Sequence, residues 1–185
     1  DLPLIPNSIE EQSVAASFRQ FITPDFANPC CLTYPPLYFY LTAGVTYLFW
    51  GVGRLFGVYP DREFFVAKVL YDPGVVTFIL RGISAISLGV VAALIFKIVQ
   101  RRYSTAAAIF SLLSILASFS LIKFSVVGQS EMLVLAAGAV VIYIAHLGLN
   151  NKKRVVFAAL VGAIAASLKY NAAVFLVPVL FTIDL

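Results

Sequence analysis

Residues 34–40 read Tyr-Pro-Pro-Leu-Tyr-Phe-Tyr, and they mark the entry into the first of several long apolar runs. The two prolines mark the boundary between the preceding loop and the apolar run, because proline fixes the backbone and removes a hydrogen-bond donor. The run from Pro36 to Gly57 is long enough, at about 1.5 Å per residue, to cross a hydrocarbon layer of about 30 Å. This stretch therefore predicts a membrane-spanning helix that begins at a proline-marked boundary.

The composition of the chain favours the same interpretation. Its 185 residues are 61% hydrophobic and only 12% charged, with a net charge of +4 and a mean hydropathy of +0.95. Soluble domains carry about 25% charged residues, so this chain has more apolar surface than a core of its own can bury. The small basic clusters suit topology signals and membrane lipids better than nucleic acid. We expect an all-α, polytopic transmembrane helix bundle.

Residues 36–185 contain five apolar runs and predict about five to six crossings. The runs are Pro36–Gly57, Thr77–Val99, Ala106–Leu121, Met132–Leu149 and Val155–Leu185. The last run is interrupted by the polar triplet Lys169-Tyr170-Asn171, which predicts two short helices or one kinked helix. Between the first two runs, Tyr59–Val76 is mixed in character and contains Asp72-Pro73-Gly74. It predicts an interfacial loop or a surface helix.

Residues 1–34 form the most polar stretch and predict a loop with one short helix over Ser8–Phe21. Ser8 can cap this helix, and Glu10-Glu11 fall in its first turn, where the helix dipole favours negative charge. Val14, Ala15, Phe18 and Phe21 recur at helical spacing, so we expect an amphipathic helix that lies on the membrane. Since the chain begins at Asp1, we expect a single membrane domain that is a piece or processed form of a longer protein.

Two basic clusters bear on membrane orientation. Lys97, Arg101 and Arg102 form the first, and Lys152-Lys153-Arg154 form the second, two predicted crossings later. Both therefore fall on one side, which the positive-inside rule makes cytoplasmic. Counting back through two crossings places Glu10-Glu11 in the cytoplasm as well, unless Tyr59–Leu80 holds an extra, broken crossing or a segment is re-entrant.

Glu10-Glu11 is the only adjacent acidic pair in the chain. A carboxylate within hydrogen-bond reach of an acceptor hydroxyl or amine can act as a general base. An interfacial helix could present such a group to a lipid-linked substrate. The alternative is that both acids only stabilise the start of a helix.

Arg81 and Lys169 are the candidate intramembrane cations. A cation at the centre of a span costs about 2.5–3.5 kcal/mol on insertion scales, so it usually faces an interior cavity. For Arg81 the alternative is snorkelling to the interface, whereas Lys169, deep in the last run, favours a cavity. Glu131 reads as the cap of the fourth predicted span, and Gly53–Gly57 matches a small-xxx-small helix contact. His146 has no companions at ligand spacing, so zinc is not predicted.

The order of these features resembles the N-terminal half of a GT-C superfamily glycosyltransferase, such as the protein mannosyltransferases and the lipid A aminoarabinose transferase. The series runs from the acidic pair through Pro24-Asp25-Phe26-Ala27-Asn28-Pro29, Tyr34-Pro35-Pro36-Leu37-Tyr38, Arg81, Arg101-Arg102-Tyr103, Glu131 and Ser167-Leu168-Lys169-Tyr170-Asn171. In that family an Asp-Glu pair lies in the first extracytoplasmic loop, so the resemblance implies that residues 1–34 form an extracytoplasmic loop, and we follow it here over the positive-inside count. Here Glu10 stands in the place of the Asp, and Tyr34 stands where a lysine would neutralise phosphate.

The resemblance implies that a sugar moves from a polyprenyl-phosphate donor to a protein or lipid/glycan acceptor, at the extracytoplasmic face of a bacterial, archaeal or endoplasmic reticulum membrane. It implies Glu10 as the base, with Glu11 as its partner or as a ligand for the acceptor or a divalent metal. The residues that it implies for substrate and lipid phosphate are Tyr34, Arg81, Lys169 and Tyr170. A transporter or flippase module, or a non-catalytic membrane subunit, is the alternative.

Overall fold

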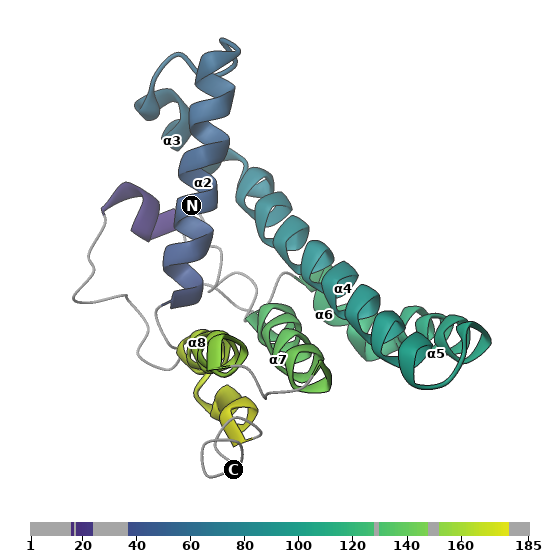
Figure 1. The fold of residues 1–185 in the computed structure, drawn as a ribbon. Coiled ribbons are helices and arrows are strands. Elements are labelled where there is room, and N and C mark those ends of the chain that lie inside the picture. Colours follow the sequence, from purple (N-terminus) through teal and green to yellow (C-terminus); the bar gives the residue numbers. More distant parts are fainter. Residues whose placement is uncertain (1–15, 17, 24–36, 128–129, 148–151, 178–185) are drawn as a thin grey trace. The chain divides into compact units, whose positions relative to one another are not determined.

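The computed structural model describes residues 16, 18–23, 37–127, 130–147 and 152–177, and this part of the chain is all-helical, with no strand. The elements are α2 (Leu37–Leu55), α3 (Arg62–Tyr71), α4 (Gly74–Arg102), α5 (Thr105–Ala117), α6 (Phe119–Val127), α7 (Ser130–His146), α8 (Lys152–Leu168) and the 3-10 helix η1 (Tyr170–Leu176) (Figure 1). The chain forms two compact units, Asp1–Gly82 and Ile83–Leu185. The all-α prediction is confirmed.

One described helix, α4, is long and apolar enough to cross a membrane, with 29 residues. A second crossing is added if the pair Thr105–Ala117 and Phe119–Val126, bent by 58°, counts as one broken span. The 17-residue α7 is apolar but shorter. By length and composition the described residues thus hold one helix that could cross a membrane, or two such spans if the bent pair counts as one. The predicted total of five to six crossings stays a prediction.

In the first unit, α2 ends in a turn that explains two glycines. Gly57 has a φ of 72°, a left-handed conformation that only glycine adopts cheaply. The carbonyl oxygen of Gly53 accepts hydrogen bonds from the backbone N–H groups of Val58 at 2.8 Å and Tyr59 at 3.3 Å, which satisfies the helix end. A Cβ on Gly53 would also overlap the ring of Tyr59. Among the described residues these glycines therefore serve a helix C-terminus, and Gly57 lies beyond the end of α2, so the two do not share the helix face that the small-xxx-small pattern requires.

The mixed stretch after this turn folds as the predicted surface-helix alternative. Asp61 caps α3, because its Oδ1 accepts a hydrogen bond from the backbone N–H of Phe64 at 2.6 Å. At the other end, Asp72 stops the helix in an extended conformation and its side chain accepts from the N–H of Gly74 at 2.9 Å. The chain then enters α4 through Pro73, a residue suited to a helix start.

In the second unit, α7 packs against both α4 and α8. Val91 of α4 lies in one apolar cluster with Ala136 and Ala139 of α7, and the Arg101 guanidinium lies over the Tyr143 ring, 5.8 Å from its centroid. These pairs advance together along both helices, so α4 and α7 run in the same direction.

The contacts between α7 and α8 run the other way. Val141 and Ile144, near the end of α7, cluster with Ala158, near the start of α8. The ends that lie opposite to this contact, the start of α7 and the end of α8, also meet, through the charged groups described next. The two helices are therefore antiparallel and lie side by side (Figure 1).

Candidate functional site

Lys169 occupies the break between α8 and η1. Its backbone is extended, with φ −158° and ψ 127°, so α8 ends at Leu168 and η1 begins at Tyr170. The predicted interruption at Lys169-Tyr170-Asn171 is thereby confirmed. The N–H of Lys169 still bonds back to the Ala165 carbonyl at 3.0 Å, and its own carbonyl accepts from Ala172 at 2.9 Å. The break therefore places a cation between two helices while both main-chain groups stay satisfied.

The ammonium group of Lys169 forms an ion pair with Glu131. Its Nζ lies 2.6 Å from Oε1 of Glu131, in the first turn of α7. The two side chains are 29% and 24% exposed, so most of each is withdrawn from solvent, but a ligand can still reach them. A charge-assisted hydrogen bond of this kind is roughly twice as strong as a neutral one. The ion pair thus holds the ammonium group of Lys169 in one place beside the helix break.

Glycines hold this pair in position by letting η1 approach its neighbours. A Cβ on Gly138 of α7 would overlap the ring of Phe175 in η1, and one on Gly162 of α8 would lie 2.5 Å from Cδ2 of Leu176. Leu168, directly before Lys169, and Met132, directly after Glu131, are both fully buried. Close packing on either side therefore fixes the two charged residues.

The Lys169–Glu131 contact was not predicted, although both residues were selected separately. Glu131 was interpreted as a helix cap, and its place in the first turn of α7 does suit the helix dipole. It is also the only acidic residue between Asp72 and Asp184. Because a lysine in an apolar segment needs a counter-ion, that scarcity was the signal that could have paired the two.

The two basic clusters lie at the opposite end of α7 from this pair. Arg101 lies over Tyr143, and Nη1 of Arg154 donates to the Leu147 carbonyl at 2.5 Å. Lys97, Arg102 and Lys152 are exposed, and each lies close to Arg101 or Arg154 in the sequence. Within the second unit, both clusters are therefore at one end of α7 and the Lys169–Glu131 pair is at the other.

Among the described residues, no ion pair or hydrogen bond joins Lys169 to another predicted site residue. Arg81 lies near the start of α4, in the first unit, where its side chain is exposed and forms no ion pair with the described part of the chain. Glu10, Glu11 and Tyr34 lie outside the described residues, as does the side chain of Tyr170. Within the described ranges no three His, Cys, Asp or Glu side chains gather where they could hold a metal ion.

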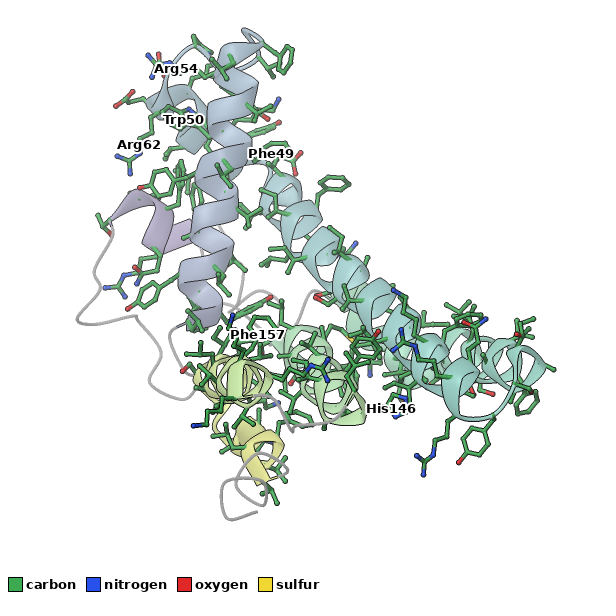
Figure 2. All side chains as sticks on the ribbon, in the orientation of Figure 1. Phe49, Trp50, Arg54, Arg62, His146 and Phe157 are labelled. Carbon is green, nitrogen blue, oxygen red and sulfur yellow. The ribbon has the colours of Figure 1, made fainter. Side chains whose placement is uncertain are left out.

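A second polar cluster, which the sequence did not predict, centres on Arg62 of α3 (Figure 2). Its Nη2 donates to the carbonyl oxygens of Phe21 at 2.6 Å and Ile22 at 2.8 Å. The hydroxyl of Tyr47 donates to the same Phe21 carbonyl at 2.6 Å. No sequence signal marks this cluster, because its acceptors are main-chain carbonyls.

Aromatic rings surround the Arg62 cluster. The guanidinium lies 5.3 Å from the ring centroid of Phe21 and 5.8 Å from that of Tyr47. Phe21 is fully buried, and its ring centroid lies 4.3 Å from that of Tyr47 and 5.3 Å from that of Phe65. Of the apolar stripe of the predicted amphipathic helix, Phe21 therefore packs on α2 and α3.

The exposed face of α8 carries large apolar side chains, whereas its buried face contains mainly small residues. Its buried positions include Ala158, Gly162 and Ala165, whereas its exposed positions include large apolar side chains: Val156, Phe157, Leu160 and Ile164. Phe157 is labelled in Figure 2. Soluble helices place large apolar residues inside, while helices in lipid pack through small residues and leave the large ones outside. The arrangement in α8 matches the lipid-facing pattern, although α8 is not among the described helices that are long and apolar enough to cross a membrane.

Comparison with protein-family models, curated proteins and solved structures finds no match to this chain.

Proposed function

We propose that this chain belongs to a multi-pass membrane glycosyltransferase that moves a sugar from a polyprenyl-phosphate donor to a protein or lipid/glycan acceptor. The observation that carries the proposal is the 2.6 Å contact between Lys169 and Glu131 at a helix break. Both residues belong to the ordered motif series that resembles the GT-C superfamily. They lie 38 positions apart in sequence and meet at one end of the α7–α8 pair, a suitable place for a lipid phosphate.

The membrane part of the proposal rests on the helices themselves. The 29-residue α4 has the length and hydropathy of a crossing, and α8 exposes large apolar side chains while burying small ones. The helices α7 and α8 of 17 residues each are about 25 Å long at about 1.5 Å per residue, which is close to the thickness of a hydrocarbon layer.

The charges of the second unit agree with the proposed face of reaction. Both basic clusters belong to one end of α7, and the positive-inside rule makes that end cytoplasmic. The Lys169–Glu131 pair belongs to the other end of the helix. If α7 crosses the membrane, the pair faces the extracytoplasmic side, where the resemblance also places sugar transfer.

In the proposed mechanism, the acceptor oxygen or nitrogen attacks the anomeric carbon of the sugar, while the bond from that carbon to the phosphate oxygen breaks. Glu10 takes the proton of the acceptor, as a general base, with Glu11 as its partner. The electron pair of the broken bond stays on the polyprenyl phosphate, and Lys169 offsets its charge. Glu131 orients Lys169 before the donor binds, and Arg81 and Tyr34 are the further candidates for the phosphate.

The test uses the full-length protein in proteoliposomes with a radiolabelled polyprenyl-phosphate sugar. Glu10→Gln and Lys169→Gln are each expected to lower kcat by about 10²-fold or more, the usual scale for losing a catalytic base or a charge that stabilises a transition state. Lys123→Gln, which removes an exposed lysine of α6, should leave turnover within about twofold of wild type. Unchanged turnover in Lys169→Gln would remove the lysine from the mechanism, and no transfer by the wild-type protein would overturn the proposed function.

A transporter or flippase is the second candidate, and the break at Lys169 favours it specifically. Transporters bind substrates at discontinuous helices whose freed backbone lines a site at mid-membrane. The two candidates differ in what happens to the lipid-linked sugar. Movement of an intact donor between leaflets, without cleavage of the sugar–phosphate bond, would favour the transporter.

A further inference from the structure

We infer that Arg62 is a positioning residue that fixes the segment after the candidate catalytic pair Glu10-Glu11 against α2 and α3; this inference rests on the proposed function. Residues 18–22 form a helical turn that follows the acidic pair in the chain. Arg62 donates to the last carbonyls of this turn, at Phe21 and Ile22. The segment is thus attached to the rest of the unit by a charged side chain.

The contacts have the form of a helix C-terminal cap supplied from another helix. The last carbonyls of a helix have no partner within it, and a cation near them is also favoured by the helix dipole. The Phe21 carbonyl accepts two hydrogen bonds, one from Arg62 at 2.6 Å and one from the Tyr47 hydroxyl at 2.6 Å. We call Arg62 and Tyr47 the clasp. The clasp joins the segment to α2 and α3 at the same point.

Apolar packing beside the clasp makes the attachment specific. The Phe21 ring is fully buried between Tyr47 and Phe65, and Phe65 in turn lies 4.9 Å from the ring centroid of Tyr59. Since the Tyr59 ring lies against Gly53 at the end of α2, the segment is packed onto the turn that connects α2 to α3. The segment therefore packs at one place on α2 and α3, and the hydrogen bonds of the clasp hold it there.

The clasp is not at its maximum strength. The Nε atom of Arg62 is buried and has no hydrogen-bond partner in the described part of the chain. An unpaired buried donor costs free energy, which offsets part of the gain from the two Nη2 hydrogen bonds.

Tryptic cleavage after Arg19, within the segment, tests this inference. Arg19 is exposed, and trypsin can cleave after it only when the turn opens locally, so the cleavage rate reports the open population. In the full-length protein, Arg62→Gln and Tyr47→Phe should each raise the rate of this cleavage about tenfold, measured by mass spectrometry of the peptide that begins at Gln20. Arg62→Lys should fall between Arg62→Gln and wild type, because a single ammonium group can reach the carbonyls without the planar geometry of arginine.

Lys68→Gln is the matched control. Lys68 lies on the same helix and its Nζ is 5.6 Å from the ring centroid of Tyr59, but it donates no hydrogen bond to residues 18–23, the described part of the segment. Removing it should leave cleavage after Arg19 unchanged. The fluorescence of Trp50, the only tryptophan, should stay at its wild-type wavelength in all four variants, which excludes general unfolding of α2 and α3.

Measurement of sugar transfer then distinguishes a positioning role of Arg62 from mere attachment of the segment. Arg62→Gln should lower kcat about tenfold or more while the KM for the polyprenyl donor stays within about twofold, and Arg62→Lys should recover part of the loss. Faster cleavage with unchanged kcat would overturn the positioning role, and unchanged cleavage in Arg62→Gln would overturn the clasp itself. If the wild-type protein transfers no sugar, the proposed function fails, whereas the cleavage rates still decide whether the clasp exists.

Discussion

At the scale of single residues, this chain accommodates two partly buried cations in different ways. Lys169 is neutralised by a carboxylate, Glu131, whereas Arg62 is satisfied by main-chain carbonyls and aromatic faces. The difference follows from the side chains, since an ammonium group is a compact charge and a guanidinium is a planar fork that also stacks on rings. Only the Lys169–Glu131 pair can be anticipated from residue types, because the main-chain carbonyls that Arg62 uses occur at every residue.

We predict that Lys169 and Glu131 are energetically coupled. Lys169→Met leaves the partly buried Glu131 carboxylate without its partner and should lower the free energy of unfolding by about 2 kcal/mol, and Glu131→Gln should cost a similar amount. The double variant should be about 1–2 kcal/mol more stable than the sum of the single changes predicts, because the pair no longer needs compensation. Denaturant unfolding in detergent, followed by circular dichroism, measures the cycle. Strict additivity would mean that the ion pair contributes nothing.

At the scale of elements, the sequence predicted the helix breaks that carry strong local signals. Asp72-Pro73-Gly74 separates α3 from α4, and Lys169 separates α8 from η1, as expected for proline and for a polar triplet within an apolar run. The break at Ser118 was missed, and Ala106–Leu121 was expected as one span. Ser118 has φ −71° and ψ 108°, yet serine in an apolar run carries no obligatory breaking signal. The 58° bend therefore depends on packing that local pattern does not encode.

The glycines show the same division between local and tertiary causes. The sequence pattern of Gly53 and Gly57 suggested a contact between helices, whereas the positive φ of Gly57 and the ring of Tyr59 place them in a turn. Gly138 gave no signal at all, although the η1 contact depends on it. A glycine looks the same in sequence whether it serves a turn, a close approach or neither.

We predict opposite effects for two Gly→Ala changes in the second unit. Gly138→Ala places a methyl group on the ring of Phe175, so η1 must shift, at a cost of about 1–3 kcal/mol in unfolding free energy. Gly89→Ala in α4 meets nothing within 4 Å and should be neutral or stabilise the helix by up to about 1 kcal/mol. The same unfolding measurement compares them, and Phe175→Ala should relieve most of the Gly138→Ala cost. Equal effects of the two changes would contradict the packing of η1 on α7.

At the scale of the whole molecule, most charged residues of the second unit lie near one or the other end of α7. The residues from Ile83 to Val177 carry eight lysines and arginines and a single acid, Glu131, and that acid is bound to Lys169 at the start of α7. Six of the cations belong to the two basic clusters: Lys97, Arg101, Arg102, Lys152, Lys153 and Arg154. The sequence pattern predicted that the clusters share a side, and in the second unit both clusters lie at one end of α7. It could not locate Lys169 relative to them, because that depends on the antiparallel packing of α8.

If α7 and α8 cross a bilayer, this polarity becomes a topology that labelling can read. In a background of Cys30→Ser and Cys31→Ser, single cysteines at Arg102, Lys152 and Asn171, all exposed, are probed with a membrane-impermeant maleimide. Arg102→Cys and Lys152→Cys should react only from the cytoplasmic face, since both belong to the basic end. Asn171→Cys, two positions after Lys169, should react only from the opposite face. Reaction of all three from the cytoplasmic face would mean that α7 does not cross, and the Lys169–Glu131 pair would then lie on the cytoplasmic side, away from the face at which the acceptor is expected.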